Sequence, residues 1–334
     1  MKKFVAYARL LRLPGIGGLA IPPVIGAITV GVFNIYFLFL VFVIGALAAL
    51  YGFILNDYAD VEIDELSEDL KGKPLVSGDI SKKTALMICI FFMLLSFLLI
   101  SILFYDQTLD HLKLGAIICI LLAGLLGSIY NLYGKKIVGS DFLVALSMAF
   151  VFLFGALAFG KPNVFTWVIF LLTFNNLLHM NAIEGGIKDA DHDHKLGVKN
   201  MALSAGVKVR GMNITIPNGF KVFSIGIRLF SAFLLFLPFI FYGYCYSTGQ
   251  IVLLTLAIVG VLIFSFKLLN IQRFNRNKIR KYIAVQSFLR YSLVPLMLVS
   301  IVDVTVSIIL IAFPIAWYLI FTPLIGEKLF RPRM

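Results

Sequence analysis

Apolar residues along this chain fall in long runs, and short polar stretches separate one run from the next. Each run holds about 20 residues, enough for a helix to cross a hydrocarbon layer of roughly 30 Å. The runs are continuous rather than alternating, so they predict helices and not barrel strands. The expected spans are 13–33, 36–56, 83–105, 112–131, 139–160, 164–184, 223–243 and 250–270.

The last apolar stretch, 282–323, is too long for one crossing and carries Asp303 near its middle. Two helices with a turn at Asp303, over 282–301 and 304–323, would bring the total to ten spans. One long helix with a re-entrant tail would bring it to nine. The fold class expected from the pattern is therefore an all-α integral membrane protein, a bundle of nine or ten transmembrane helices.

Composition agrees with a membrane protein, since 60% of the 334 residues are apolar and the mean hydropathy is +0.98. The cysteines Cys89, Cys119 and Cys245 lie within apolar runs at no metal-binding spacing, so we interpret them as core residues. The basic N-terminus leads into a full-length span without a clear cleavage site, so we expect it to be retained. A single integral membrane domain over 1–334 is the expected organisation.

Positive charges predict the orientation of the bundle. Lys and Arg concentrate at the N-terminus and in the loops after the second, fourth, sixth and eighth spans, so this side is expected to be cytoplasmic. The net charge of +12 suits a cytoplasmic face next to anionic lipid and requires no nucleic acid. We therefore expect a multi-pass protein of the cell membrane.

Negative charges are distributed differently, and most lie in two loops on the same side. Of the 17 Asp and Glu residues, eight lie in 57–79 and four in 184–193. Asp57, Asp60 and Asp64 have spacings of three and four, which places them on one face of a helix that continues the second span.

Asp189 and Asp193 likewise share one helical face at the end of the sixth span. Carboxylates this close repel one another, so a cation is expected between them. Oxygen ligands without converging His or Cys suit Mg²⁺ or Ca²⁺, and Mg²⁺ is often shared between carboxylates and a phosphate. The two stretches predict two Mg²⁺ ions around a diphosphate. The alternative for either stretch is a solvated loop, which we expect for Glu62, Glu65, Glu68 and Asp69.

Four separated segments resemble motifs of the UbiA superfamily of intramembrane prenyltransferases. Asn56–Asp64, "NDYADVEID", resembles the first aspartate motif, and Lys73–Ser81, "KPLVSGDIS", resembles the segment that follows it. "YNLYGKK" places Tyr130 and Lys135 like the family's tyrosine-to-lysine motif. "KDADHDHKLGVKNMA" resembles the second aspartate motif, with Asp189 and Asp193 in the matching places.

The chain also departs from the family pattern. Lys73 stands where Arg is usual, and Gly186 occupies the first position of a longer second motif. Glu184 lies close by but on a different helical face. The segment 206–222 looks like an insertion whose period-two alternation and "PNG" turn signal predict a hairpin over the cytoplasmic mouth, or an idle surface insert.

The resemblance implies a UbiA-like bundle around a central cavity, with its active site toward the cytoplasm. The implied activity is Mg²⁺-dependent transfer of a polyprenyl group from an isoprenyl diphosphate to a lipophilic or aromatic acceptor, with release of diphosphate. The implied metal ligands are Asn56, Asp57, Asp60, Asp64, Asp189 and Asp193. The implied diphosphate contacts are Asn56, Lys73, Lys135, Lys188 and Lys195. Tyr130 would stabilise an allylic cation with its ring or bond the diphosphate.

The acceptor and the catalytic base are not identified by these motifs, although the first motif is most similar to members that make archaeal glycerophosphate lipid or menaquinone-type quinones. A divalent-cation carrier is an alternative function, but its acids should lie deep in the membrane, and only Asp303 is a candidate. Phosphoalcohol transfer from a CDP-linked donor would need a Gly-Ala-Arg-rich motif that this chain lacks.

Overall fold

The computed structural model describes residues 2–66 and 70–326, so Glu68 and Asp69 lie outside the described residues. The first half of the chain forms α1 (Lys2–Leu10), α2 (Leu13–Leu19), α3 (Pro22–Thr29), α4 (Ile35–Asp64), α5 (Lys82–Leu103), α6 (His111–Tyr133), the 3₁₀ turn η2 (Gly134–Lys136) and α7 (Asp141–Leu157). The second half forms α8 (Val164–Leu178), the π-helix η3 (His179–Gly185), α9 (Gly186–Lys188), α10 (Ala190–Lys195), α11 (Met201–Ser204), β1 (Lys208–Arg210), β2 (Asn213–Thr215), α12 (Asn218–Tyr242), α13 (Thr248–Leu269), α14 (Arg276–Leu298) and α15 (Val304–Leu324).

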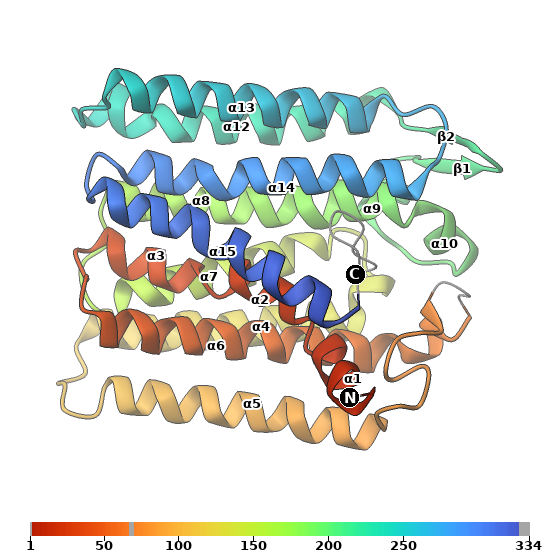
Figure 1. Ribbon diagram of the computed structural model, residues 1–334, viewed down its shortest axis with the longest axis horizontal. Coiled ribbons are helices and arrows are strands. Elements are labelled where there is room, and N and C mark those ends of the chain that lie inside the picture. The colour runs from red at the N-terminus through yellow and green to blue at the C-terminus, as the bar shows by residue number, and fades with distance from the viewer. Residues whose placement is uncertain (1, 67–69, 327–334) are drawn as a thin grey trace.

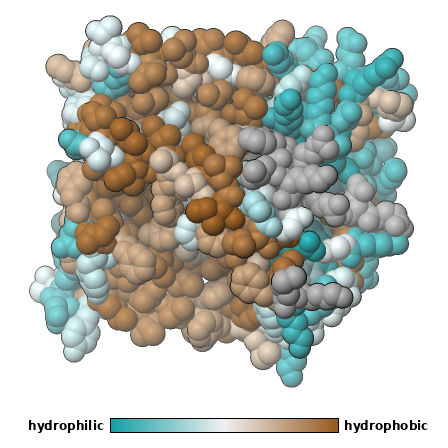
Figure 2. Space-filling model, viewed as in Figure 1, coloured by the Kyte–Doolittle hydropathy of each residue, from teal (hydrophilic) through white to brown (hydrophobic). Residues whose placement is uncertain are grey.

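The long helices run nearly parallel, with α5 at one edge of the bundle and α12 and α13 at the other (Figure 1). The N-terminal α1, the short α10 and the strands gather at the same end of the bundle (Figure 1). Hydrophilic residues cover this end, while the surface beside it is hydrophobic (Figure 2). Among the described residues, eight helical segments are long and apolar enough to cross a membrane, and α7 is a shorter apolar helix. The protein is a multi-pass membrane protein.

Polar residues between the apolar runs begin the helices. Asn34, Ser81, Asp110 and Ser247 each accept a hydrogen bond from a backbone N–H of the first turn of α4, α5, α6 and α13. Asp303 does the same for α15, with 2.7 Å between its Oδ1 and the nitrogen of Thr305. The last apolar stretch thus forms two helices, α14 and α15, with the predicted turn at Asp303, but of these two only α15 is among the eight candidate membrane spans of the described residues.

The first expected span is not one helix. It is divided into α2 and α3 because Pro22 and Pro23 lack the N–H groups that a continuous helix needs. Before α2, Arg12 has a left-handed backbone with φ of 44°, a conformation that costs energy for a residue with a Cβ. This turn directs the Arg12 side chain toward the end of α4.

The inserted segment forms the antiparallel hairpin of β1 and β2, with Val209 opposite Ile214. Its turn lies at Gly211, whose φ of 59° is favourable for glycine. The expected turn at "PNG" is wrong, because Pro217 instead precedes the first residue of α12. Proline suits this position because its fixed φ leads into a helix without the need for a donor.

Two glycines allow α3 and α7 to touch along their backbones. A Cβ on Gly155 would overlap the carbonyl oxygen of Pro23, and a Cβ on Gly26 would overlap that of Phe152. Both overlapping atoms belong to the backbone, so they cannot rotate away as a side chain could. This contact brings α7 into the centre of the bundle, where it forms one wall of the cavity described below.

We expect Gly155→Ala to destabilise the protein because the added methyl must push α3 away from α7. Overpacking of this kind costs about 1–3 kcal/mol or more, and thermal unfolding in detergent would measure it. Gly226→Ala is the control, since Gly226 is in α12 with no neighbouring atoms within 4 Å of its Cβ position. Equal unfolding temperatures for the two variants would contradict the proposed backbone contact.

Candidate functional site

The first acidic cluster lies at the C-terminal end of α4, where Asp57, Asp60 and Asp64 are all buried. Its spacing was predicted to place the three carboxylates on one face, and each one is bound by a basic side chain. Arg12 donates to Asp57 over 2.6 Å and to Oδ1 of Asn56 over 3.2 Å. Arg12 therefore connects the N-terminal segment to the first motif.

Two lysines complete the neutralisation of this cluster. The Lys73 ammonium lies 3.0 Å from Asp57 and 2.6 Å from Asp64, and the Lys135 ammonium lies 3.0 Å from Asp60. Burial alone would lower the pKa of Lys73, but the carboxylates of Asp57 and Asp64 raise that pKa overall. Lys73 therefore stays charged, and it holds the loop after α4 against the helix end.

The second acidic cluster consists of Asp189 and Asp193, on either side of the first turn of α10. Lys188 lies 3.3 Å from Asp189, while Asn200 donates to Asp193 over 2.6 Å. Burial and the neighbouring Asp189 raise the pKa of Asp193 to about 6. A carboxylate under this repulsion would gain from a cation placed between the two acids.

Lys135 joins the two clusters. It pairs with Asp60 at the end of α4, and its positive charge also lowers the pKa of Asp193 against the effect of burial. Its backbone carbonyl accepts a hydrogen bond of 2.8 Å from the nitrogen of Lys199, in the loop that follows α10. The structure thus brings the two motifs together around this lysine.

A cavity of about 440 Å³ extends from this site into the bundle between α4, α5, α6 and α7. Arg12, Asn56, Tyr130 and Asn181 line it beside the acidic clusters, and most of the remaining wall is apolar. The Tyr130 hydroxyl approaches Oδ1 of Asn181 at 3.5 Å. The cavity can therefore hold an apolar molecule with its polar end at Arg12 and Asn56, which border the first acidic cluster.

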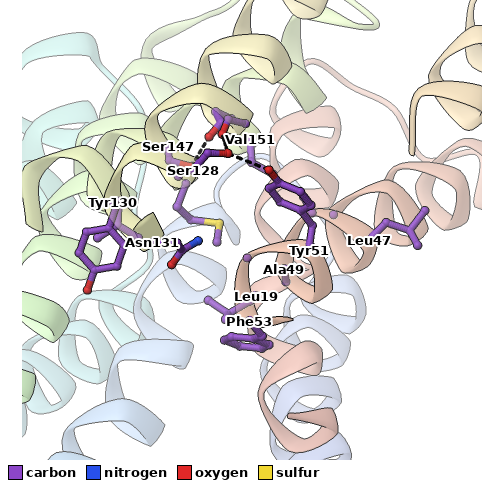
Figure 3. A pocket seen from close by; sticks show the side chains of 18 of the residues that line it. Leu19, Leu47, Ala49, Tyr51, Phe53, Ser128, Tyr130, Asn131, Ser147 and Val151 are labelled. Atoms are coloured by element: carbon purple, nitrogen blue, oxygen red, sulfur yellow. Dashed lines mark hydrogen bonds between the residues drawn. The ribbon is translucent and has the colours of Figure 1, made fainter. Parts of the chain in front are cut away.

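A few polar groups lie deeper in the cavity. Tyr51 on α4 and Ser128 on α6 point toward each other (Figure 3), with 2.8 Å between their oxygens. Ser147 on α7 donates to the carbonyl of Ala123 over 2.7 Å. The hydroxyls of Tyr51, Ser128 and Ser147 are thus hydrogen-bonded within the protein.

The predicted residues do not all meet at the site. Lys195 is exposed and lies outside the ion pairs found among the described residues. Glu62, which was expected to be solvated, is 88% exposed at its side chain. Asp191 points to the other side of α10, where it binds Arg276 at 2.6 Å.

Sequence reasoning missed three residues of the site: Arg12, Asn181 and Asn200. Arg12 was counted only among the cytoplasmic basic residues, and its left-handed backbone has no signal in the sequence. Asn181 lies five residues before Gly186, in a segment that also carries Asn175, Asn176 and His179. Polar residues in an apolar span indicate buried polar contacts, but the sequence does not distinguish Asn181 from these neighbours.

Glu184 does not substitute for the missing acid at Gly186. It is buried away from the site and binds Arg228 and Arg290 at 2.8 Å and 3.1 Å. Gly186 itself lies against α11, where a Cβ would be 2.6 Å from the Cβ of Ala202. The longer form of the second motif therefore has no room in this protein.

The donor set fits Mg²⁺, because the clusters offer carboxylate and amide oxygens without converging sulfur or imidazole ligands. Among the described residues, no group of three His, Cys, Asp or Glu side chains converges as a preformed metal cage. Instead, Arg12, Lys73 and Lys135 neutralise the first cluster. A divalent ion would have to share or replace these ammonium and guanidinium partners.

The sequence matches the model of the UbiA prenyltransferase family over residues 19–294. It is 27% identical over 167 residues to a 4-hydroxybenzoate octaprenyltransferase of Vesicomyosocius okutanii, a match that covers 50% of this chain but only 58% of that protein. It is 30% identical over 209 residues to a digeranylgeranylglyceryl phosphate synthase of Sulfurisphaera tokodaii, a match that covers 61% of this chain and 70% of that protein.

Solved structures share the fold at low sequence identity. A UbiA homologue from Archaeoglobus fulgidus bound to GPP and Mg²⁺ has a TM-score of 0.62 at 18% identity, and the match covers 89% of this chain and 99% of that one. A structure described for digeranylgeranylglyceryl phosphate synthase also has a TM-score of 0.62, at 21% identity and with 95% and 100% coverage. These matches support the all-α membrane bundle predicted from the sequence.

We expect Gly186→Asp to destabilise the protein by about 1–3 kcal/mol because its side chain must displace α11. Despite its extra carboxylate, it should not bind Mg²⁺ more tightly. Thermal unfolding and Mg²⁺ titration would measure the two effects. Gly185→Ala is the matched control, since its nearest neighbour would be the Met180 carbonyl at 3.4 Å. Tighter Mg²⁺ binding by the aspartate variant would show that the site accepts the longer motif.

Proposed function

Since this chain belongs to the UbiA prenyltransferase family, we propose that it transfers a prenyl group from an isoprenyl diphosphate to a lipophilic acceptor and releases diphosphate. The observation that supports this most is the meeting of two acidic clusters around Lys135, next to a mostly apolar cavity whose polar end is lined by Arg12 and Asn56. Such a site can hold a charged head and an apolar tail at once.

The acidic clusters would hold two Mg²⁺ ions, which when bound would neutralise charge that develops on the departing diphosphate. Asp57, Asp60 and Asp64 would form one site, and Asp189 and Asp193 the other. Asn56, next to Arg12, would act as a ligand or orient a carboxylate. In this proposal, the three aspartates of the first cluster are buried because they bind metal.

The basic residues would change partners when the substrate enters. Lys73 and Lys135 are held by carboxylates in the structure, and a metal-bound diphosphate would offer their ammonium groups phosphate oxygens instead. Arg12 and Lys188 lie next to the same acids and would contribute in the same way. The exposed Lys195 is the weakest of the diphosphate contacts predicted from the sequence.

The apolar cavity would keep water from the allylic cation that forms as the carbon–oxygen bond breaks. The prenyl chain would lie in the cavity, against the wall formed by α4, α5 and α6. The Tyr130 ring, which lines the cavity, would stabilise positive charge on the first prenyl carbons. Its hydroxyl, near Asn181, is an alternative contact for the diphosphate.

Two classes of acceptor follow from the names of the relatives: an aromatic quinone precursor and an archaeal glycerophosphate lipid. In this proposal the whole chain acts as a single membrane domain, because the two acidic clusters come from different helices of one bundle. The basic end of the bundle, which carries the site and the β1–β2 hairpin (Figure 1), would face the cytoplasm.

We expect purified protein with geranylgeranyl diphosphate and a panel of both acceptor classes to form a prenylated product only in the presence of Mg²⁺. EDTA should abolish the reaction. Asp60→Ala and Asp189→Ala should each lower kcat/KM by about 10²- to 10³-fold, because each removes part of the charge stabilisation at the leaving group. Chromatographic detection of labelled product would measure the rate and identify the acceptor.

Glu62→Ala is the matched control, because Glu62 is on the same helix as Asp60 but is exposed. Its activity should equal that of the unaltered protein. If no acceptor reacts, Mg²⁺-dependent binding of geranylgeranyl diphosphate tests whether the protein is a prenyltransferase, independently of the acceptor. Failure to bind it, together with Mg²⁺ transport into liposomes that contain the protein, would replace the proposal with a divalent-cation carrier.

A further inference from the structure

A second group of charged residues is buried outside the proposed active site. Glu184 at the end of η3 pairs with Arg228 on α12 and with Arg290 on α14, at 2.8 Å and 3.1 Å. The exposed fraction is 9% or less for each of the three residues. We name these three residues the Glu184 cluster. It connects three helices in the interior, where an unpaired charge would be costly.

The hydrogen bonds around the cluster are specific. Nδ1 of His179 lies 2.8 Å from the Arg228 guanidinium and 3.3 Å from Oε1 of Glu184, and Nε2 of the ring lies 2.9 Å from the Ser224 hydroxyl. Arg228 also donates to Oε1 of Gln286 over 3.2 Å. The His179 contacts restrain the position of η3 relative to α12, and the Gln286 contact joins α12 to α14.

Glu184 and the neighbouring His179 lie at the two ends of the only π-helical segment among the described residues. His179 begins η3, and Glu184 is its next-to-last residue. A π turn holds one more residue than an α turn, so it rotates everything after it relative to a continuous α-helix. This turn is what directs Glu184 toward the arginines and the following Lys188 and Asp189 toward the acidic site.

A π turn has poorer intrinsic stability than an α turn, so tertiary contacts must select it. The Glu184 cluster supplies such contacts within η3 itself. Beyond η3, Arg276 of α14 donates to the carbonyl of Lys188 and to Asp191, at 3.4 Å and 2.6 Å. The second acidic segment is thus held from α14 on both sides of Asp189.

We infer that the Glu184 cluster is a positioning device for the second metal site: it stabilises the π turn and so sets the direction of Lys188, Asp189 and Asp193. The three residues do not touch the cavity and are not proposed as ligands. This inference rests on the proposed function for its metal, but the conformation of the segment after η3 can be measured without metal.

The test is Glu184→Gln, which keeps the shape of the side chain and removes its charge. In metal-free protein, backbone amides of 186–200 should exchange hydrogen faster than in the unaltered protein. The Mg²⁺ concentration for half-maximal binding of geranyl diphosphate should rise about 10- to 100-fold, as is found when partners of metal ligands are removed. Thr166→Val is the control, because Thr166 is buried at the other end of α8 and bonded to Thr29 at 2.9 Å.

Arg290→Gln is a second variant in case the first does not fold. It leaves one arginine paired with Glu184, so the two positive charges and one negative charge of the cluster become one of each, and it should produce the same changes to a smaller extent. Unchanged exchange at 186–200 in the variants that fold would overturn the inference, as would an equal Mg²⁺ shift in Thr166→Val. If the unaltered protein does not bind geranyl diphosphate, the proposed function fails, while the exchange experiment still decides whether the cluster holds the segment.

Discussion

The organisation of the polar end of the bundle depends on three carboxylates buried at the C-terminus of one helix. Carboxylates in this position are disfavoured twice, by burial and by the negative end of the helix dipole. Arg12, Lys73 and Lys135 compensate for both effects. Since these cations come from the N-terminal turn, the loop after α4 and the turn after α6, neutralising the aspartates also assembles the site.

The two acidic clusters differ in how they are held. The first is buried and fully paired, so its geometry is set by ion pairs to its own carboxylates. The second is more exposed, with Asp189 39% exposed at its side chain, and it depends on its backbone being directed by η3 and by α14. Lys135 contacts the first cluster and influences the second electrostatically. A change in the charge of either cluster is therefore expected to affect the other through this lysine.

The sequence predicted the elements that depend on local periodicity or on one residue's chemistry. Apolar runs located the long helices, and Asp303 marked the turn before α15 because an aspartate there caps a helix. The aspartate spacing also located both clusters. Glu184 lies away from the site as its helical face predicted, but the "PNG" signal was wrong, because it became a helix start. Arg12 was missed because its role depends on a turn stabilised only in the folded protein.

The position of the acids favours the proposed prenyl transfer over ion transport. An ion path needs charged or polar groups at successive depths, but the described cavity is mostly apolar beyond Asn56 and Tyr130. Glu184 is occupied by two arginines. Asp303, the one acid that the sequence offered for such a path, is at an exposed helix start instead. Acids confined to one end of an apolar chamber would hold a cation there without conducting it, which is the arrangement that a diphosphate with a long apolar tail requires.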